Sequence, residues 1–295
     1  MSVTLTCGDL EATFVPETGM VGCSLTHRGE ELLGQRGGLE AYIAERKTMG
    51  IPLLYPWANR LSSKRFTVAG REVDIDPERT PLRLDGGGLP MHGLLSAAPG
   101  WRVEHQDEAT LEATFDFAAH PELMAAFPFD HTLRIDVTLD ERTLRVATTV
   151  TAGTTGVPIA FGFHPYLTLP GVPRADWQVE LPVTEQLVLD DQMLPTGDRA
   201  GVDIPAGPLG DRTFDDAYLA PAAPFALEGG GRRIELAFEA GYPYAQVFAP
   251  PGDALIAFEP MTAPTNALRS GRGLQLLAPD HDFVARFAIS VAGAP

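Results

Sequence analysis

The feature that most constrains this fold is an alternation of apolar and polar residues with a period of two. In the segment 133–139, LRIDVTL, every second residue is apolar and those between are charged or polar. That period is typical of a β-strand with one face against a core and the other in solvent. The same pattern recurs in three further segments: 111–117, 234–238 and 283–291.

Turn-forming residues separate these segments, as in Asp140-Glu141 and Gly229-Gly230-Gly231. Helical periodicity is not sustained anywhere. We expect only one or two helical turns over 121–127, where Pro121 suits the first turn. The strand–helix rhythm of a parallel α/β sheet is missing from the pattern. The sequence therefore predicts an all-β chain, a large and mostly antiparallel β-sandwich, with residues 1–295 in a single domain.

Composition narrows the possible partners. A net charge of −17 disfavours nucleic acid and anionic membranes, which both need basic surfaces. No apolar run approaches the length of a membrane span, and the first residues lack the features of a signal peptide. We therefore expect a cytoplasmic protein with reduced thiols, in which Cys7 and Cys23 are ordinary strand or core residues.

Two ionisable residues lie in distinctive apolar surroundings. His164 is in the segment 161–167, FGFHPYL, and Glu259 follows the apolar run 254–258. Facing each other across a sugar ring, an imidazole and a carboxylate could open and reclose a cyclic hemiacetal. Their reference pKa values of about 6.5 and 4.3 would let imidazolium and carboxylate coexist. Taken alone, His164 is better explained as a hydrogen-bonded core residue, and Glu259 as a salt-bridged or capping residue.

Three further residues are candidates for binding sugar hydroxyls. Arg60 lies among aromatic residues and an amide, although a surface arginine packed on Trp57 would give the same pattern. His92 lies in a Gly- and Pro-rich segment, 83–100, that we expect to be a long surface loop. Asp215 has a neighbouring acid and could equally be a turn or cap residue.

Motifs for other chemistries are missing. The sequence has no HExxH, HxH or Cys/His cluster with metal-ligand spacing, no Walker A loop and no GxSxG elbow. Gly86-Gly87-Gly88 lacks the spacing of a dinucleotide site. We therefore predict no metal and no cofactor.

Taken together and in order, five segments resemble the aldose 1-epimerase (galactose mutarotase) family over nearly the whole chain. They are Asn59-Arg60-Leu61, His92-Gly93, Phe163-His164-Pro165-Tyr166, Phe214-Asp215-Asp216-Ala217-Tyr218 and Glu259-Pro260-Met261-Thr262. The resemblance implies a β-supersandwich with a sugar cleft and no cofactor. It also implies that His164 is the general acid at the ring oxygen, and Glu259 the general base at the C1 hydroxyl. Arg60, His92 and Asp215 would then bind hydroxyls.

The expected function is interconversion of the α and β anomers of a free hexose or related sugar by a monomer or homodimer. The chain departs from the family's commoner sequence at Leu167-Thr168-Leu169 and at Asp216. The identity of the sugar therefore remains open between glucose, galactose and phosphorylated or sulfonated hexoses. These departures also leave open which of the two adjacent aspartates faces the cleft.

Three alternative functions remain. A relative of hexose-6-phosphate epimerases would need a phosphate cluster, for which Lys64 and Arg65 are candidates. A carbohydrate-binding or sensing protein on the same fold would not turn sugar over. A glycoside hydrolase would need two carboxylates flanking the bond, and only one is well placed.

Overall fold

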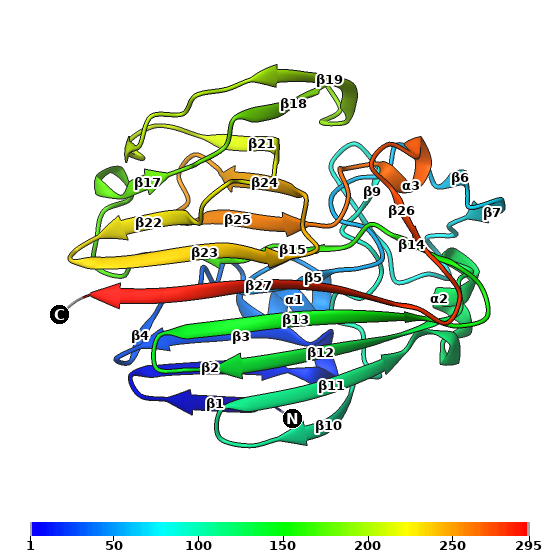
Figure 1. Cartoon of the computed structure of the whole chain (residues 1–295), viewed down its shortest axis with the longest axis horizontal. Helices are drawn as coiled ribbons and strands as arrows, with labels where there is room; N and C mark the ends of the chain where they lie inside the picture. The colour runs from blue at the N-terminus through cyan, green and yellow to red at the C-terminus, as the bar shows by residue number, and fades with distance from the viewer. Residues whose placement is uncertain (1, 294–295) are drawn as a thin grey trace.

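The computed structural model describes residues 2–293, and two large antiparallel sheets dominate it (Figure 1). The first sheet has nine strands in the spatial order β10 (Arg102–Gln106), β11 (Thr110–Asp116), β12 (His131–Leu139), β13 (Thr143–Ala152), β27 (Asp282–Gly293), β23 (Arg232–Ala240), β22 (Phe225–Gly229), β17 (Gln178–Glu180) and β20 (Gly207–Pro208). The last strand of the chain, β27, therefore lies between β13 and β23 in the middle of this sheet (Figure 1).

The second large sheet carries the candidate residues His164, Asp215 and Glu259 on or beside its strands. Its order is β19 (Pro195–Gly201), β18 (Glu185–Leu189), β21 (Phe214–Leu219), β24 (Tyr244–Ala249), β25 (Ile256–Met261), β15 (Gly162–Phe163) and β5 (Leu53–Leu54), with β16 (Tyr166–Leu167) also paired to β25.

Smaller sheets and short helices complete the described chain. A four-stranded sheet contains β1 (Val3–Cys7), β2 (Leu10–Val15), β3 (Val21–His27) and β4 (Glu30–Glu31). The two-stranded pairs are β6 (Arg65–Val68) with β7 (Arg71–Asp74), β8 (Arg83–Leu84) with β9 (Pro90–Met91), and β14 (Val157–Ile159) with β26 (Gln275–Leu277). The helices are α1 (Gly38–Glu45), α2 (Pro121–Ala126) and α3 (Ala267–Ser270), with single 3-10 turns at Pro16–Thr18, Phe117–Ala119 and Arg174–Asp176.

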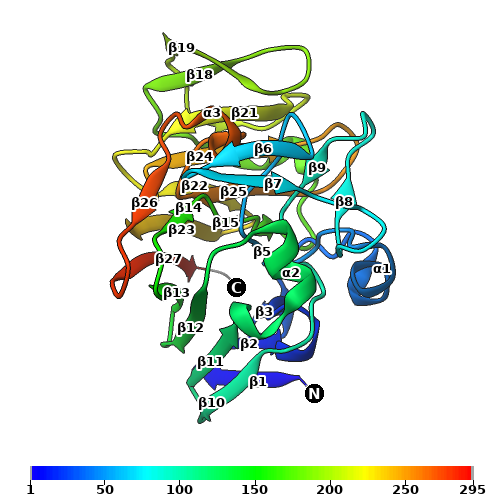
Figure 2. The same cartoon turned by 90° about the vertical axis from the view of Figure 1, so that its right-hand side faces the viewer.

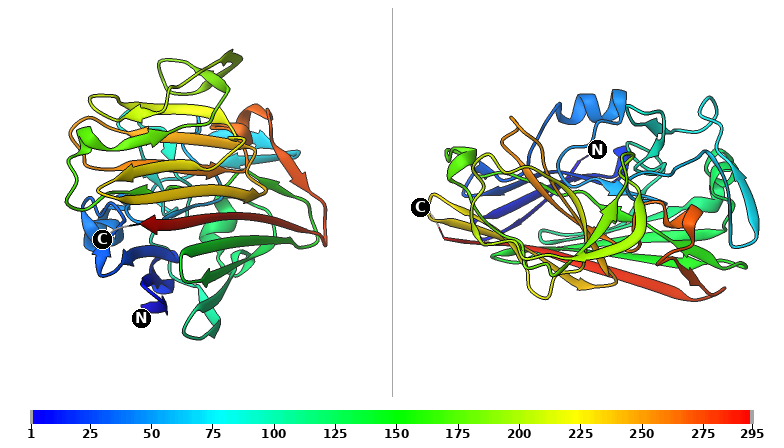
Figure 3. Two further views of the ribbon diagram at one scale, coloured as in Figure 1. Left: turned by 60° about the vertical axis from the view of Figure 1, so that its left-hand side comes forward. Right: turned by 90° about the horizontal axis from the view of Figure 1, so that it is seen from above.

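Helix α2 lies at one end of the sandwich and α1 on one of its sides. Figure 2 shows α2 and the β6–β7 hairpin at one end of the sheets. In the right-hand view of Figure 3, α1 lies on the side of the molecule away from β27. The expected helical turns over 121–127 are confirmed as α2, with Pro121 in its first turn.

Aromatic contacts join the two large sheets. Phe225 of β22 stacks on Phe258 of β25 with ring centroids 4.9 Å apart, and Phe163 of β15 lies 5.1 Å from Phe287 of β27. These contacts belong to a hydrophobic cluster that reaches from the first strand to the last. The predicted all-β, mostly antiparallel sandwich is confirmed, and the reach of this cluster supports our proposal of a single domain over 1–295.

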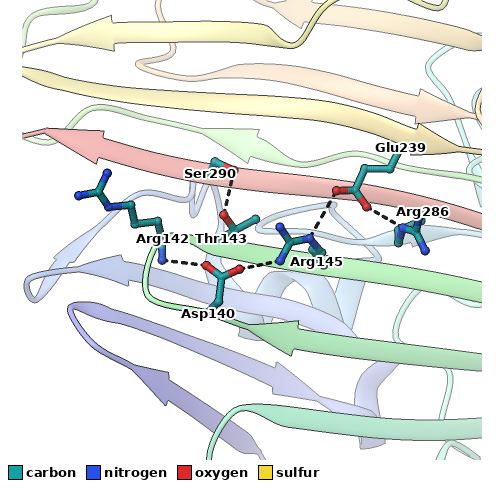
Figure 4. Close-up of polar contacts among 7 residues, drawn as sticks. All are labelled: Asp140, Arg142, Thr143, Arg145, Glu239, Arg286 and Ser290. Carbon is teal, nitrogen blue, oxygen red and sulfur yellow. Dashed lines mark hydrogen bonds and ion pairs between the residues drawn. The ribbon is translucent and has the colours of Figure 1, made fainter.

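The period-two pattern corresponds to burial along the strands. In β12 the apolar residues are buried, and the polar residues between them are exposed or half-buried. On the polar face of the same sheet, Arg145 bonds Asp140 at 2.6 Å and Glu239 at 3.4 Å, and Glu239 also bonds Arg286 at 2.6 Å (Figure 4). These ion pairs are exposed, so each contributes little to stability.

Candidate active site

Strand register brings His164 and Glu259 together. His164 lies between β15 and β16, which hold one register against β25: Gly162 pairs with Met261, and Tyr166 with Ala257. That register places His164 opposite Glu259. Between the two short strands, Pro165 has no N–H to donate, so the ladder is interrupted beside the histidine. The structure thus brings the two catalytic candidates to one point of the second sheet.

Residues of the neighbouring strands join His164 and Glu259 in lining a small polar cavity. Gln246 of β24 is opposite Glu259, and Phe248, two residues further on the same face, is opposite Asp215 of β21. The cavity has a volume of about 140 Å³. Its lining residues are Arg36, Thr48, Asn59, Arg60, Arg83, Met91, His92, His164, Tyr166, Asp215, Phe248 and Glu259. Pockets for drug-sized ligands have volumes of about 300–1,000 Å³, so this smaller cavity suits one small polar ligand.

The acid–base pair is in direct contact. His164 Nε2 lies 3.1 Å from Glu259 Oε1, and the two side chains are 5% and 1% exposed. The expected arrangement places the two groups on opposite sides of a sugar ring, and in the structure they lie side by side at ion-pairing distance. At this separation a proton donor and a proton acceptor can act on two neighbouring atoms of one ligand.

Burial works against the charged form of both partners. It lowers the pKa of His164 well below its usual value, and the nearby guanidinium groups of Arg36 and Arg83 lower it further. Burial also raises the pKa of Glu259 well above its usual value, with a further increase from Asp215 that Arg60 opposes. The coexistence of imidazolium and carboxylate expected from reference pKa values is thus disfavoured at this buried site. Burial therefore favours a neutral imidazole beside a protonated carboxyl group.

Several buried polar atoms at the site have no hydrogen-bond partner within residues 2–293. They include Glu259 Oε2, His164 Nδ1 and His92 Nδ1. His92 is 2% exposed, and its ring lies 5.7 Å from the His164 ring, edge to face. Burying a polar atom without a partner is costly. These atoms are therefore suited to hydrogen bonds with a polar ligand.

Close backbone packing holds His92 in place. Its N–H donates to the Asn59 carbonyl at 2.8 Å, and the next residue, Gly93, has a φ of +72° and packs on the backbone of Tyr55. Leu94 and the residue after it are fully buried. The expectation of a long surface loop over 83–100 is therefore wrong for its second half, because these residues pack into the core. Within this segment, the exposed residues are Leu84, Gly86–Gly88, Pro99 and Gly100.

The two adjacent aspartates point to opposite faces of β21. Asp215 lines the cavity and accepts a hydrogen bond from Gln246 Nε2 at 2.7 Å. Asp216 accepts one from Gln186 Nε2 at 2.8 Å and does not line the cavity. Successive residues of a strand alternate between faces, so the structure answers a question that the sequence left open.

Arg60 also lines the cavity, and its Nε lies 2.8 Å from Asp85 Oδ2. Both side chains are mostly buried, at 17% and 13% exposed. Trp57 is 1% exposed and belongs to the core, so the alternative of a surface arginine packed on this ring does not describe the site.

Sequence reasoning missed two arginines that line the cavity, Arg36 and Arg83. Arg36 Nη1 donates to the Tyr166 hydroxyl at 3.1 Å, and the Tyr166 ring stacks on His164 with centroids 4.1 Å apart. Neither arginine has a recognisable motif, since they come from a Gly-rich connection and a two-residue strand. Conversely, Lys64 and Arg65, considered as a phosphate cluster, are not among the lining residues.

Two further searches concern the whole described chain. Within residues 2–293, His, Cys, Asp and Glu side chains form no group of three or more suited to hold a metal ion. In the same range, no helix has the length and hydropathy needed to cross a lipid bilayer.

The fold and the site define a β-sandwich protein whose small polar cavity contains a buried histidine–glutamate pair. Residues 2–290 match the model of the family described as aldose 1-epimerase. The chain therefore belongs to the aldose 1-epimerase family, as the five sequence segments indicated.

Individual relatives agree with this assignment. The chain is 25% identical over 292 residues to the uncharacterized protein YihR of Escherichia coli K12, covering 94% of this chain and 88% of that protein. Among solved structures, a galactose mutarotase-like protein from Clostridium acetobutylicum superposes with a TM-score of 0.85 at 16% identity, covering 99% of this chain and 95% of the other. A galactose 1-epimerase from Lactobacillus acidophilus gives 0.78 at 16% identity, with coverage of 100% and 95%. At these identities the structures show the shared fold.

Proposed function

We propose that this protein is an aldose 1-epimerase that interconverts the α and β anomers of a small aldose. The observation that carries the proposal is the 3.1 Å contact between His164 Nε2 and Glu259 Oε1 at the wall of a small polar cavity. Family membership supports a sugar epimerase activity of this kind.

The geometry fits the chemistry of a hemiacetal. Ring opening removes the proton from the C1 hydroxyl and adds a proton to the ring oxygen, and both oxygens are attached to C1. An acid and a base must therefore reach two atoms that are close together, as an adjacent pair can. Rotation about the C1–C2 bond then exposes the other face of the aldehyde, and the reverse transfers close the ring.

Each residue has a proposed role. Glu259 takes the C1 hydroxyl proton, and His164 supplies a proton to the ring oxygen and takes it back on closure. The neutral pair and the ion pair contain the same number of protons, so substrate can convert one form into the other without proton uptake from solvent. Arg60 favours the carboxylate form of Glu259. Arg60, His92 and Asp215 bind ring hydroxyls.

The reaction asks for no group beyond these side chains, so we propose that it proceeds without a cofactor and on a small-molecule sugar. A cytoplasmic location and a monomeric or homodimeric state remain part of this proposal.

The test is the rate of anomer equilibration of freshly dissolved α-D-glucose, α-D-galactose and anionic aldoses, followed by polarimetry or NMR. We expect wild type to accelerate at least one sugar, and His164→Ala and Glu259→Ala to lose that acceleration. Sugar binding without any rate effect in wild type would instead identify a carbohydrate-binding protein on the same fold.

A further inference from the structure

Three guanidinium groups, those of Arg36, Arg60 and Arg83, line a cavity of about 140 Å³. The chain has 39 acidic and 22 basic residues, so a cationic lining runs against its overall composition. Of these three arginines, only Arg60 has a carboxylate within ion-pairing distance in the described chain, and that carboxylate belongs to Asp85. Such a lining suits a ligand that itself carries negative charge.

The other two arginines are held in place by uncharged partners. Arg36 donates to the Tyr166 hydroxyl, and its guanidinium lies 5.4 Å from the centroid of the Tyr166 ring and 5.9 Å from that of Phe248. Arg83 directs Nη1 toward the Arg46 carbonyl at 3.4 Å. Each guanidinium has five N–H donors, so most of the donors of both groups are free for a ligand.

The cavity has a histidine side and a carboxyl side. The Arg36 guanidinium lies over the Tyr166 ring, which stacks on His164. Arg83 is opposite Met91 in the β8–β9 pair, next to His92, whose ring is 5.7 Å from that of His164. Asp215 lies toward Glu259, since it accepts a hydrogen bond from Gln246, which pairs with Glu259. In keeping with these positions, Arg36 and Arg83 lower the pKa of His164, whereas Asp215 and Arg60 act in opposite directions on the pKa of Glu259.

This division corresponds to positions on an aldopyranose. When Glu259 serves the C1 hydroxyl and His164 the ring oxygen, the carbon on the far side of the ring oxygen, C5 of a hexose, lies on the histidine side. We propose that Arg36 and Arg83 bind an anionic group that the sugar carries on this carbon, as a phosphate, sulfonate or carboxylate. The inference rests on the proposed function and names its substrate class.

An anion at this place would also act on the chemistry. The positive charges of Arg36 and Arg83 lower the pKa of His164. A bound anion would offset them, raise the pKa of His164 and favour the imidazolium that donates a proton to the ring oxygen. The anionic group would therefore increase kcat as well as lower KM.

The test compares glucose, glucose 6-phosphate, 6-deoxy-6-sulfoglucose and glucuronate by magnetisation transfer between their anomeric protons at equilibrium. The variants are Arg36→Met, Arg83→Met and the charge-conserving Arg36→Lys, with Arg65→Met as the matched control. Arg65 is exposed, pairs with Asp74 and lies outside the cavity. Circular dichroism would verify that each variant folds.

We expect wild type to convert at least one anionic sugar with a kcat/KM about tenfold or more above that for glucose, because charge-assisted hydrogen bonds are the strong ones. Arg36→Met and Arg83→Met should each lower that ratio about tenfold, Arg36→Lys should lower it less, and Arg65→Met should leave it unchanged.

Equal or better conversion of glucose in wild type would overturn the inference, as would a ratio unaffected by both methionine variants. Calorimetric binding of the same sugars separates this inference from the proposed function. Binding of an anionic sugar that is lost in Arg36→Met, with no acceleration of any sugar, would support the anion site and contradict the epimerase.

Discussion

The substitution Gly93→Ala tests how the backbone positions His92. Gly93 has a φ of +72°, and an added Cβ would overlap the Tyr55 carbonyl and lie 2.8 Å from the Tyr55 nitrogen. The left-handed conformation costs a residue with a Cβ about 1–2 kcal/mol. Relieving the overlap with backbone adds about 1–3 kcal/mol, as in other overpacked sites. The two terms together give a loss of stability of about 2–5 kcal/mol.

Gly29→Ala is the matched control. Gly29 has a φ of +77°, and an added Cβ would meet nothing within 4 Å. Only the conformational cost of about 1–2 kcal/mol applies there. The assay is urea unfolding of both variants, with thermal unfolding in parallel, where about 2–4 °C is expected per kcal/mol for a chain somewhat shorter than this one.

The same substitution should also change the site. Relief of the overlap must move the segment that carries His92, so KM for the sugar should rise in Gly93→Ala and stay the same in Gly29→Ala. Losses of stability that agree within about 0.5 kcal/mol in the two variants would refute the argument that close packing on Tyr55 requires glycine at position 93.

Three other predictions follow from single contacts. Asp215→Asn should raise KM about tenfold, as expected when a bond to a charged group is weakened, whereas Asp216→Asn should change it little; steady-state kinetics showing the reverse would contradict the placement of Asp215. Burial lowers the pKa of His131 from 6.5 to about 4, so the unfolded state binds more protons below pH 6.5 and stability falls as the pH drops toward 4. The full contribution of His131 to this loss of stability is about 3 kcal/mol. Urea unfolding between pH 4.5 and 7 should therefore show that the free energy of unfolding depends less steeply on pH in His131→Phe than in wild type. An equal pH dependence in the two proteins would contradict the lowered pKa of His131. Finally, dialysis against EDTA should leave the rate of anomer equilibration unchanged, and recovery of a lost rate by added metal would refute the cofactor-free mechanism.

Alternation predicted the strands because burial on one face leaves a period of two in the sequence, as in β12. It could not predict how the strands pair. The contact between His164 and Glu259 depends on the register of β15 and β16 against β25, and these are two-residue strands separated by Pro165. Strands so short carry too few residues to show a period.

The residues of the candidate site could be predicted where they lie in a sequence motif. They could not be predicted where only tertiary packing places them in the cavity. The five segments identified the residues that the structure brings to one cavity. Arg36 and Arg83 were missed because they come from irregular connections, where nothing local distinguishes a cavity arginine from an exposed one. The burial of residues 91–98 was missed because a Gly- and Pro-rich composition is shared by exposed loops and by tightly packed ones.

The shifted pKa values show a further limit of sequence reasoning. Reference values predicted an ion pair, but burial of both groups in one cavity reverses the preference to a neutral pair. Only the three-dimensional surroundings, including the arginines that the sequence did not reveal, determine this outcome.

The most direct test of the account is a double-mutant cycle on the acid–base pair, with Glu259→Gln, His164→Asn and both together, measured as kcat/KM for anomer equilibration. If the adjacent pair performs both transfers as proposed, each single change should lower kcat/KM about 10²–10⁴-fold, and the double variant should be little worse than the less active single variant. Losses that multiply in the double variant, or full activity in Glu259→Gln, would contradict the claim that the two residues act as a unit.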